Sequence, residues 1–104
     1  MHITIEEKSE SEILISMSGQ YWETSDLIKF ETHIHSSIDK NITTIKIDLS
    51  RVSFLSSQAL GLFVSAYKEL KKIGGKLVLI KPQGTIYEMI EIAGLDEIME
   101  IEQD

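Results

Sequence analysis

The stretch 46–61 (KIDLSRVSFLSSQALG) constrains the fold most, because it predicts a buried strand, a short turn and the first turn of a helix in direct succession. The strand, residues 42–49, nearly alternates apolar and polar side chains and is rich in β-branched residues. A helix is predicted from about Ser57 to Ile73, and Gly74-Gly75 is a typical helix stop. Three apolar residues between strand and helix are expected to continue into the core: Val52, Phe54 and Leu55.

The rest of the chain repeats this alternation of strands and helices. The further expected elements are strands at 2–6 and 12–17, a helix capped by Thr24 or Ser25 and ending near Asp39, a strand at 76–80, a helix at 85–93 and a last short strand or tail near 98–101. The apolar run at 76–80 is typical of a central strand buried on both faces. The opening hairpin must be antiparallel, whereas strands joined through helices pair in parallel. We therefore predict an α/β fold with a mixed four- to five-stranded sheet, antiparallel in the N-terminal hairpin and parallel in the centre, with helices packed against it.

Composition limits the class of protein. A chain of 104 residues is typical of one domain, so a single domain over 1–104 is expected. The net charge of −7 disfavours direct nucleic-acid binding and attraction to anionic membranes, which both require a positive field. Cysteine is absent, which excludes disulfides, thiol catalysis and cysteine-ligated metals. No apolar run approaches the roughly 18 residues of a membrane span, and no signal peptide is visible, so a cytoplasmic protein without membrane insertion is expected.

No group of residues predicts catalysis or a metal site. Asp48 has no evident partner acid, histidine or metal, and is better explained as a turn residue that bonds the backbone of Ser50 or Arg51. His33 and His35 would point about 200° apart on a helix, so they cannot share a metal ion. We therefore expect no enzyme activity, no cofactor and no metal, and an interaction module is the default interpretation.

The serine pair Ser56-Ser57 is the strongest candidate for function. Ser56 is a natural N-cap and Ser57 a natural first helical residue, and capping alone would account for the pair at about 1 kcal/mol. Alternatively, Ser57 is a phosphorylation site. Free amides and the positive end of the helix dipole stabilise an anion there, and a phosphate would bring nearly two negative charges to an exposed protein-docking rim.

Trp22, the only tryptophan, leaves two interpretations open. It is either a partly buried anchor for the loop before the first helix or an exposed aromatic side chain in a partner interface, where tryptophan is enriched.

Several blocks of the chain resemble the STAS domain, as found in bacterial anti-sigma factor antagonists. The resemblance covers essentially the whole chain and rests on residues 47–54, 60–62, 71–79, 86–89 and 92–98. The usual signature of that family is Asp-Ser-Ser/Thr-Gly-Leu-Gly, and residues 56–61 (SSQALG) stand in its place. Ser57 takes the position of the phosphorylated serine. Ser56 replaces the aspartate and removes a charge, Gln58 removes the second hydroxyl, and Ala59 favours an ordinary helical backbone.

The resemblance implies a function through partners. It suggests an anti-sigma factor antagonist that binds an anti-sigma factor with serine kinase activity, is switched off by phosphorylation at Ser57 and is restored by a PP2C-type phosphatase. The alternative is a non-phosphorylated STAS scaffold, or an accessory subunit of a sensory complex or lipid transporter. The predicted partner-binding residues are Gly19, Gln20, Tyr21, Trp22, Ser56, Ser57, Gln58 and Leu62.

Overall fold

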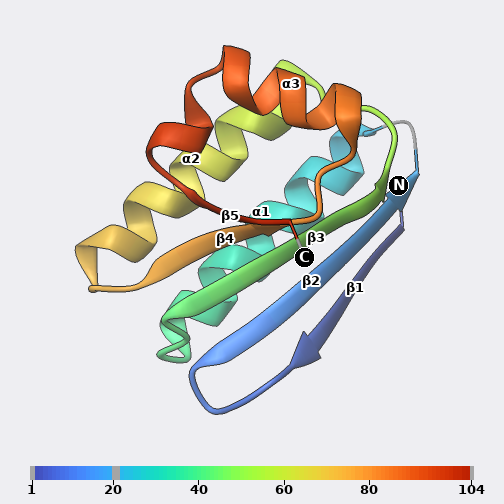
Figure 1. The fold of residues 1–104 in the computed structure, drawn as a ribbon. Helices are drawn as coiled ribbons and strands as arrows, with labels where there is room; N and C mark the ends of the chain where they lie inside the picture. The colour runs from blue at the N-terminus through green and yellow to red at the C-terminus, as the bar shows by residue number, and fades with distance from the viewer. Residues whose placement is uncertain (1, 20–21, 104) are drawn as a thin grey trace.

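The computed structural model describes residues 2–19 and 22–103. Its elements, in chain order, are β1 (His2–Glu7), β2 (Glu12–Gly19), α1 (Thr24–Asp39), β3 (Thr44–Val52), α2 (Ser57–Lys72), β4 (Lys76–Ile80), α3 (Gly84–Ile92), the 3₁₀ turn η1 (Leu95–Glu97) and β5 (Glu100–Glu102) (Figure 1). The predicted alternation of strands and helices is confirmed, and the C-terminal segment includes a short strand.

The five strands form one mixed sheet in the order β1-β2-β3-β4-β5. The pair β1/β2 is antiparallel, and the pairs β2/β3, β3/β4 and β4/β5 are parallel, as predicted. Residues 76–80 form an interior strand that is buried on both faces, as predicted: β4 pairs with β3 on one side and β5 on the other, and Leu77, Val78 and Leu79 are all buried. The middle strand of the five is β3.

One face of the sheet carries the core. Ile15, Ile47 and Leu79 lie opposite one another on adjacent strands and are fully buried. Helices α1 and α2 lie side by side (Figure 1), and the buried residues of all three helices join the same core: Phe30, Ile34, Ala59, Phe63, Ala66, Leu70, Ile86 and Ile90. Because side chains alternate between the two faces of a strand, every second side chain points into a single apolar layer between the sheet and the helices.

Two local predictions were wrong for identifiable reasons. The N-cap residue of α1 is Glu23, not Thr24 or Ser25: its backbone is extended (φ −85°, ψ 164°), and its amide donates a hydrogen bond of 2.8 Å to the carboxylate of Asp26. Phe54 was expected in the core but is 50% exposed. Strand β3 ends at Val52, so the alternation stops before Phe54 and the following loop turns its side chain outward. None of the described helices is long and apolar enough to cross a membrane.

Candidate functional site

The N-terminus of α2 is held by Ser56. Its backbone is extended (φ −80°, ψ 162°), and its Oγ accepts a hydrogen bond of 3.1 Å from the amide of Ala59. This is the geometry of an N-cap, in which a side-chain oxygen satisfies an amide that the helix leaves unpaired. The predicted cap is confirmed, and the hydroxyl of Ser56 is committed to it.

Ser57 is the first residue of α2 and its side chain is exposed, as is that of Gln58. The flanking residues Leu55 and Ala59 are fully buried, so the backbone on both sides is anchored in the core. The segment therefore presents Ser57 and Gln58 to solvent from a fixed position, and the hydroxyl of Ser57 is accessible to another protein.

Gly19 brings the end of β2 against the loop that precedes α2. Its carbonyl oxygen accepts hydrogen bonds from the amide of Ser53 at 3.3 Å and from the Ser53 hydroxyl at 3.4 Å. Gly19 has a φ of 123°, which a residue with a side chain rarely adopts. The predicted partner residues Gln20 and Tyr21 follow it directly but lie outside the described residues.

Trp22 is half-buried and packs on two core aromatics. Its ring lies edge-on to Phe30 at a centroid distance of 6.0 Å and to Phe63 at 6.5 Å. Its buried Nε1 has no hydrogen-bond partner among the described residues. These contacts support the interpretation of Trp22 as an anchor for the loop before α1, and a contact between Trp22 and a partner stays a prediction.

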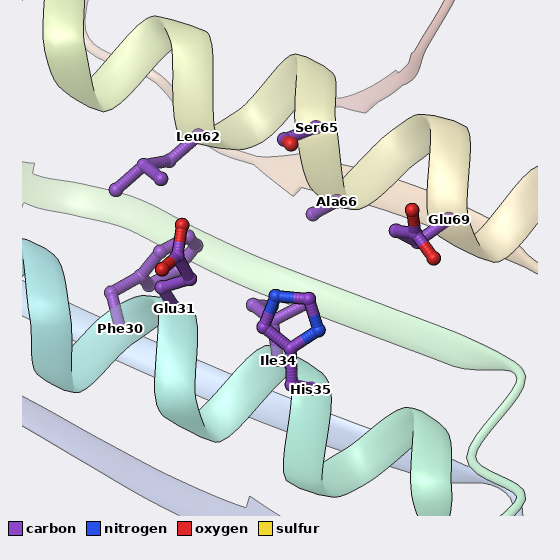
Figure 2. Close-up of a pocket in the computed structure, with 8 residues that line it drawn as sticks. All are labelled: Phe30, Glu31, Ile34, His35, Leu62, Ser65, Ala66 and Glu69. Atoms are coloured by element: carbon purple, nitrogen blue, oxygen red, sulfur yellow. The ribbon is translucent and has the colours of Figure 1, made fainter.

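Leu62 lies between α1 and α2, more than one turn after the start of α2. It is half-buried and lines a small pocket between α1 and α2 together with Phe30 and Ile34. Figure 2 shows its side chain extending toward α1, with Glu31 beside Phe30 and with His35 and Glu69 farther along the two helices. The structure thus places Leu62 in the helix–helix contact, and its predicted role in partner binding stays a prediction.

Asp48 has a structural role that the sequence partly indicated. Its Oδ1 accepts a hydrogen bond of 2.9 Å from the amide of Ser50, as predicted. It does not end the strand, however, because β3 continues to Val52 through an irregularity at which Ser16 pairs with Asp48 and Ser18 with Arg51. The carboxylate therefore binds the amide of Ser50 where the parallel register shifts. The described residues contain no group of three or more histidine or acidic side chains that could hold a metal ion.

Comparisons with known proteins agree on one family. The family model described as "STAS domain" matches residues 5–104. The anti-sigma-B factor antagonist of Listeria monocytogenes is 32% identical over 100 residues, which cover 95% of this chain and 86% of that protein. The structure resembles that of the unphosphorylated anti-sigma factor antagonist SpoIIAA, with a TM-score of 0.86 and 23% identity over 96% of this chain and 87% of that one.

The Bacillus cell fate determinant SpoIIAA in its phosphorylated form has the same fold, with a TM-score of 0.80 and 22% identity over 96% of this chain and 90% of that one. The sheet order, the capped helix α2 and these matches lead to one assignment. This chain belongs to the STAS domain family.

Proposed function

We propose that this protein is a cytoplasmic anti-sigma factor antagonist of one domain, residues 1–104, that is switched off by phosphorylation of Ser57. Its partner would be an anti-sigma factor with serine kinase activity, and a PP2C-type phosphatase would restore it. The chain would act by binding alone, and the phosphoryl-transfer chemistry would belong to its partners. The observation that carries the proposal is the exposed hydroxyl of Ser57 at the start of a helix whose cap is supplied by a different residue, Ser56.

The capping geometry explains how a phosphate on Ser57 could change the surface without unfolding the helix. The hydrogen bond that starts α2 uses the Oγ of Ser56, so esterification of the Ser57 hydroxyl leaves it in place. A phosphate at a helix N-terminus is also stabilised by the dipole. Phosphorylation would thus add nearly two negative charges to the docking surface while the fold stays intact.

The names of related proteins support an anti-sigma factor as the partner. The Listeria monocytogenes protein is named an anti-sigma-B factor antagonist, and SpoIIAA has been solved in both unphosphorylated and phosphorylated forms. We propose that the docking surface includes the start of α2 together with Gly19, Gln20, Tyr21 and Trp22, of which Gly19 is hydrogen-bonded to Ser53. Trp22 itself is held beside α1 and α2 by its ring contacts with Phe30 and Phe63.

Replacing Ser57 by aspartate is expected to weaken binding to the anti-sigma factor by about 10- to 100-fold, because the partner must desolvate an added charge. Replacing Ser57 by alanine should leave binding unchanged and make it insensitive to kinase and ATP. Titration calorimetry against a purified anti-sigma factor kinase from the same organism measures both effects. The aspartate variant should remain folded, since a carboxylate is favourable at a helix N-terminus.

Thr32→Asp is the control, because Thr32 is an exposed hydroxyl residue two turns into α1. It adds the same charge to an exposed helix face away from the start of α2 and should bind like the wild type. Equal binding by Ser57→Asp and Ser57→Ala would argue against the switch and favour a constitutive scaffold. Phosphopeptide mass spectrometry after incubation with the kinase would then be expected to find no phosphate on Ser57.

A further inference from the structure

Strand β1 forms an open edge of the sheet (Figure 1). Among the described residues it pairs with β2 alone, in one continuous antiparallel register from His2 to Glu7. A free edge presents unpaired backbone groups, which natural proteins protect with a very short strand, proline, a bulge or charged side chains. The opposite edge is protected in this way, because β5 has three residues and two of them are glutamates. Strand β1 has six residues, no proline and no register shift, so it is the edge that can accept another strand.

The hydrogen bonds of the hairpin decide which backbone groups of β1 face outward. The amide of Lys8 donates to the carbonyl of Glu12 at 2.9 Å. Opposite residues in an antiparallel pair alternate between those that are hydrogen-bonded to each other and those that are not. Counting back from Lys8, the even-numbered residues of β1 bond to β2, and the amides and carbonyls of Ile3 and Ile5 point away from the sheet. These two residues therefore offer a donor and an acceptor each to an added strand.

The side chains of Ile3 and Ile5 are incompletely covered. Ile3 is half-buried and Ile5 is 37% exposed, whereas Ile15, which lies opposite Ile5 on β2, is fully buried. A hollow of about 250 Å³ lies between β1 and α1, and its lining includes Ile5, Ile13 and His33. A strand added to β1 would bring side chains beside these isoleucines. Association at this edge would thus bury apolar surface as well as pair backbone groups.

A second copy of this chain supplies a strand that complements the edge. A two-fold axis perpendicular to the sheet makes two β1 strands antiparallel and keeps the helices of both copies on one side. Centring the axis on Thr4 places Ile3 opposite Ile5 of the second copy. These are the residues whose backbone groups face outward, so each such pair exchanges hydrogen bonds. The same register places His2, whose ring donates hydrogen bonds, opposite the carboxylate of Glu6.

Other registers are less favourable. Centring the axis on Ile5 places Ile3 opposite the carboxylate of Glu7. Centring it on Glu6 places two carboxylates directly opposite each other, which is destabilising. Centring it on Ile3 shortens the described ladder to residues 2–4. A shift by a single residue brings the apolar side chains opposite residues that point to the other face of the sheet. The register centred on Thr4 is therefore the one that matches apolar with apolar and donor with acceptor.

We infer that β1 is a self-association edge, through which two copies of this chain form a dimer with one continuous sheet. This inference goes beyond the proposed function and does not involve Ser57. The contact is small, and the net charge of −7 on each copy opposes association. We therefore expect a weak dimer with a dissociation constant of about 100 µM.

Sedimentation equilibrium of the full chain between about 10 µM and about 1 mM measures this association. The wild type should shift from monomer to dimer over this range. Ile5→Lys places a charge in the ladder and should weaken association by about tenfold or more. Ile92→Lys is the matched control, because Ile92 on α3 is 87% exposed and receives the same change of charge. It should associate like the wild type, and circular dichroism checks that both variants are folded.

Single cysteines test the register in an otherwise wild-type strand, since the chain has no cysteine of its own. Thr4→Cys would place two thiols opposite each other at the axis, with Cα atoms about 4.5 Å apart, which a disulfide can bridge. Glu6→Cys is the control, because Glu6 is also exposed on β1 but would lie about 13 Å from its copy. Under mild oxidation Thr4→Cys should form the cross-linked dimer about tenfold faster or more than Glu6→Cys.

The outcomes decide the inference without an anti-sigma factor. A concentration-dependent dimer that Ile5→Lys weakens and Ile92→Lys does not, with selective cross-linking of Thr4→Cys, would establish the self-association edge. A wild-type protein that stays monomeric up to about 1 mM would overturn it. Equal association of the two lysine variants, or equal cross-linking of the two cysteine variants, would also overturn it, since association would then use another surface. Ser57→Asp should dimerise like the wild type, so the proposed function stands or fails separately.

Discussion

Replacing Phe63 by alanine is expected to lower the free energy of unfolding by about 3–5 kcal/mol, which is the usual cost of deleting a large buried aromatic side chain. Phe63 is fully buried in α2 and lies 5.6 Å from Phe30 of α1, measured between ring centroids. Trp22 closes the same cluster at 6.5 Å from Phe63. The deletion would leave a cavity where α1, α2 and the segment before α1 meet. Neighbouring rings cannot fill such a cavity without leaving their own contacts.

Urea unfolding followed by tryptophan fluorescence measures this effect and reports directly on Trp22. Phe54→Ala is the matched control, because it makes the same chemical change at a position that is 50% exposed. It should cost about 1 kcal/mol or less. A loss below about 1 kcal/mol for Phe63→Ala would contradict the role assigned to the aromatic cluster. The comparison separates Phe63, which is fully buried and supports the fold, from Phe54, which is half exposed.

Local patterns were sufficient to predict most of the fold. The alternation at 42–49, followed by a helical pattern from Ser57, indicated a crossover and parallel pairing, because few other arrangements bury both apolar faces. The Ser56 cap and the bond from Asp48 to the Ser50 amide were predictable for the same reason. Each involves residues two or three positions apart and depends little on the rest of the molecule.

Features that depend on distant contacts could not be predicted in this way. The outward position of Phe54 follows from where β3 ends and from the bond between Ser53 and Gly19, which are 34 residues apart. Periodicity alone placed Phe54 in the core with Val52, since the two are separated by one residue. The central position of β3 likewise depends on β5, whose three residues are too few to show a clear pattern. The position of Ser57 at a helix start could be predicted from neighbouring residues alone. The exposure of Phe54 nearby depends on distant contacts and could not.

Gly75 and Gly61 differ in whether the fold has room for a side chain. Replacing Gly75 by alanine is expected to lower the free energy of unfolding by about 3 kcal/mol, because a Cβ there would overlap the carbonyl oxygen of Thr43 and lie 3.1 Å from its carbonyl carbon. The backbones of Gly75 and Thr43 are both fixed by hydrogen bonds and cannot easily move apart. The Gly75 amide donates to the Leu70 carbonyl at 2.7 Å, and the Thr43 carbonyl accepts from the Lys76 amide at 2.8 Å.

Gly74 provides the intermediate case, because its φ of 75° disfavours a side chain while a Cβ would meet no neighbouring described atom within 4 Å. Gly74→Ala should therefore cost about 1–2 kcal/mol. Stability, measured by urea unfolding, should rank Gly61→Ala above the wild type, then Gly74→Ala, then Gly75→Ala. A Gly75→Ala variant as stable as Gly74→Ala would contradict this argument, because it would show that the backbone before β4 can shift away from Thr43 at little cost. If the order holds, Gly75 is required by the close approach of two backbones in the fold. Gly61, by contrast, is not required by any neighbouring described atom, so its replacement by alanine tests helix propensity alone.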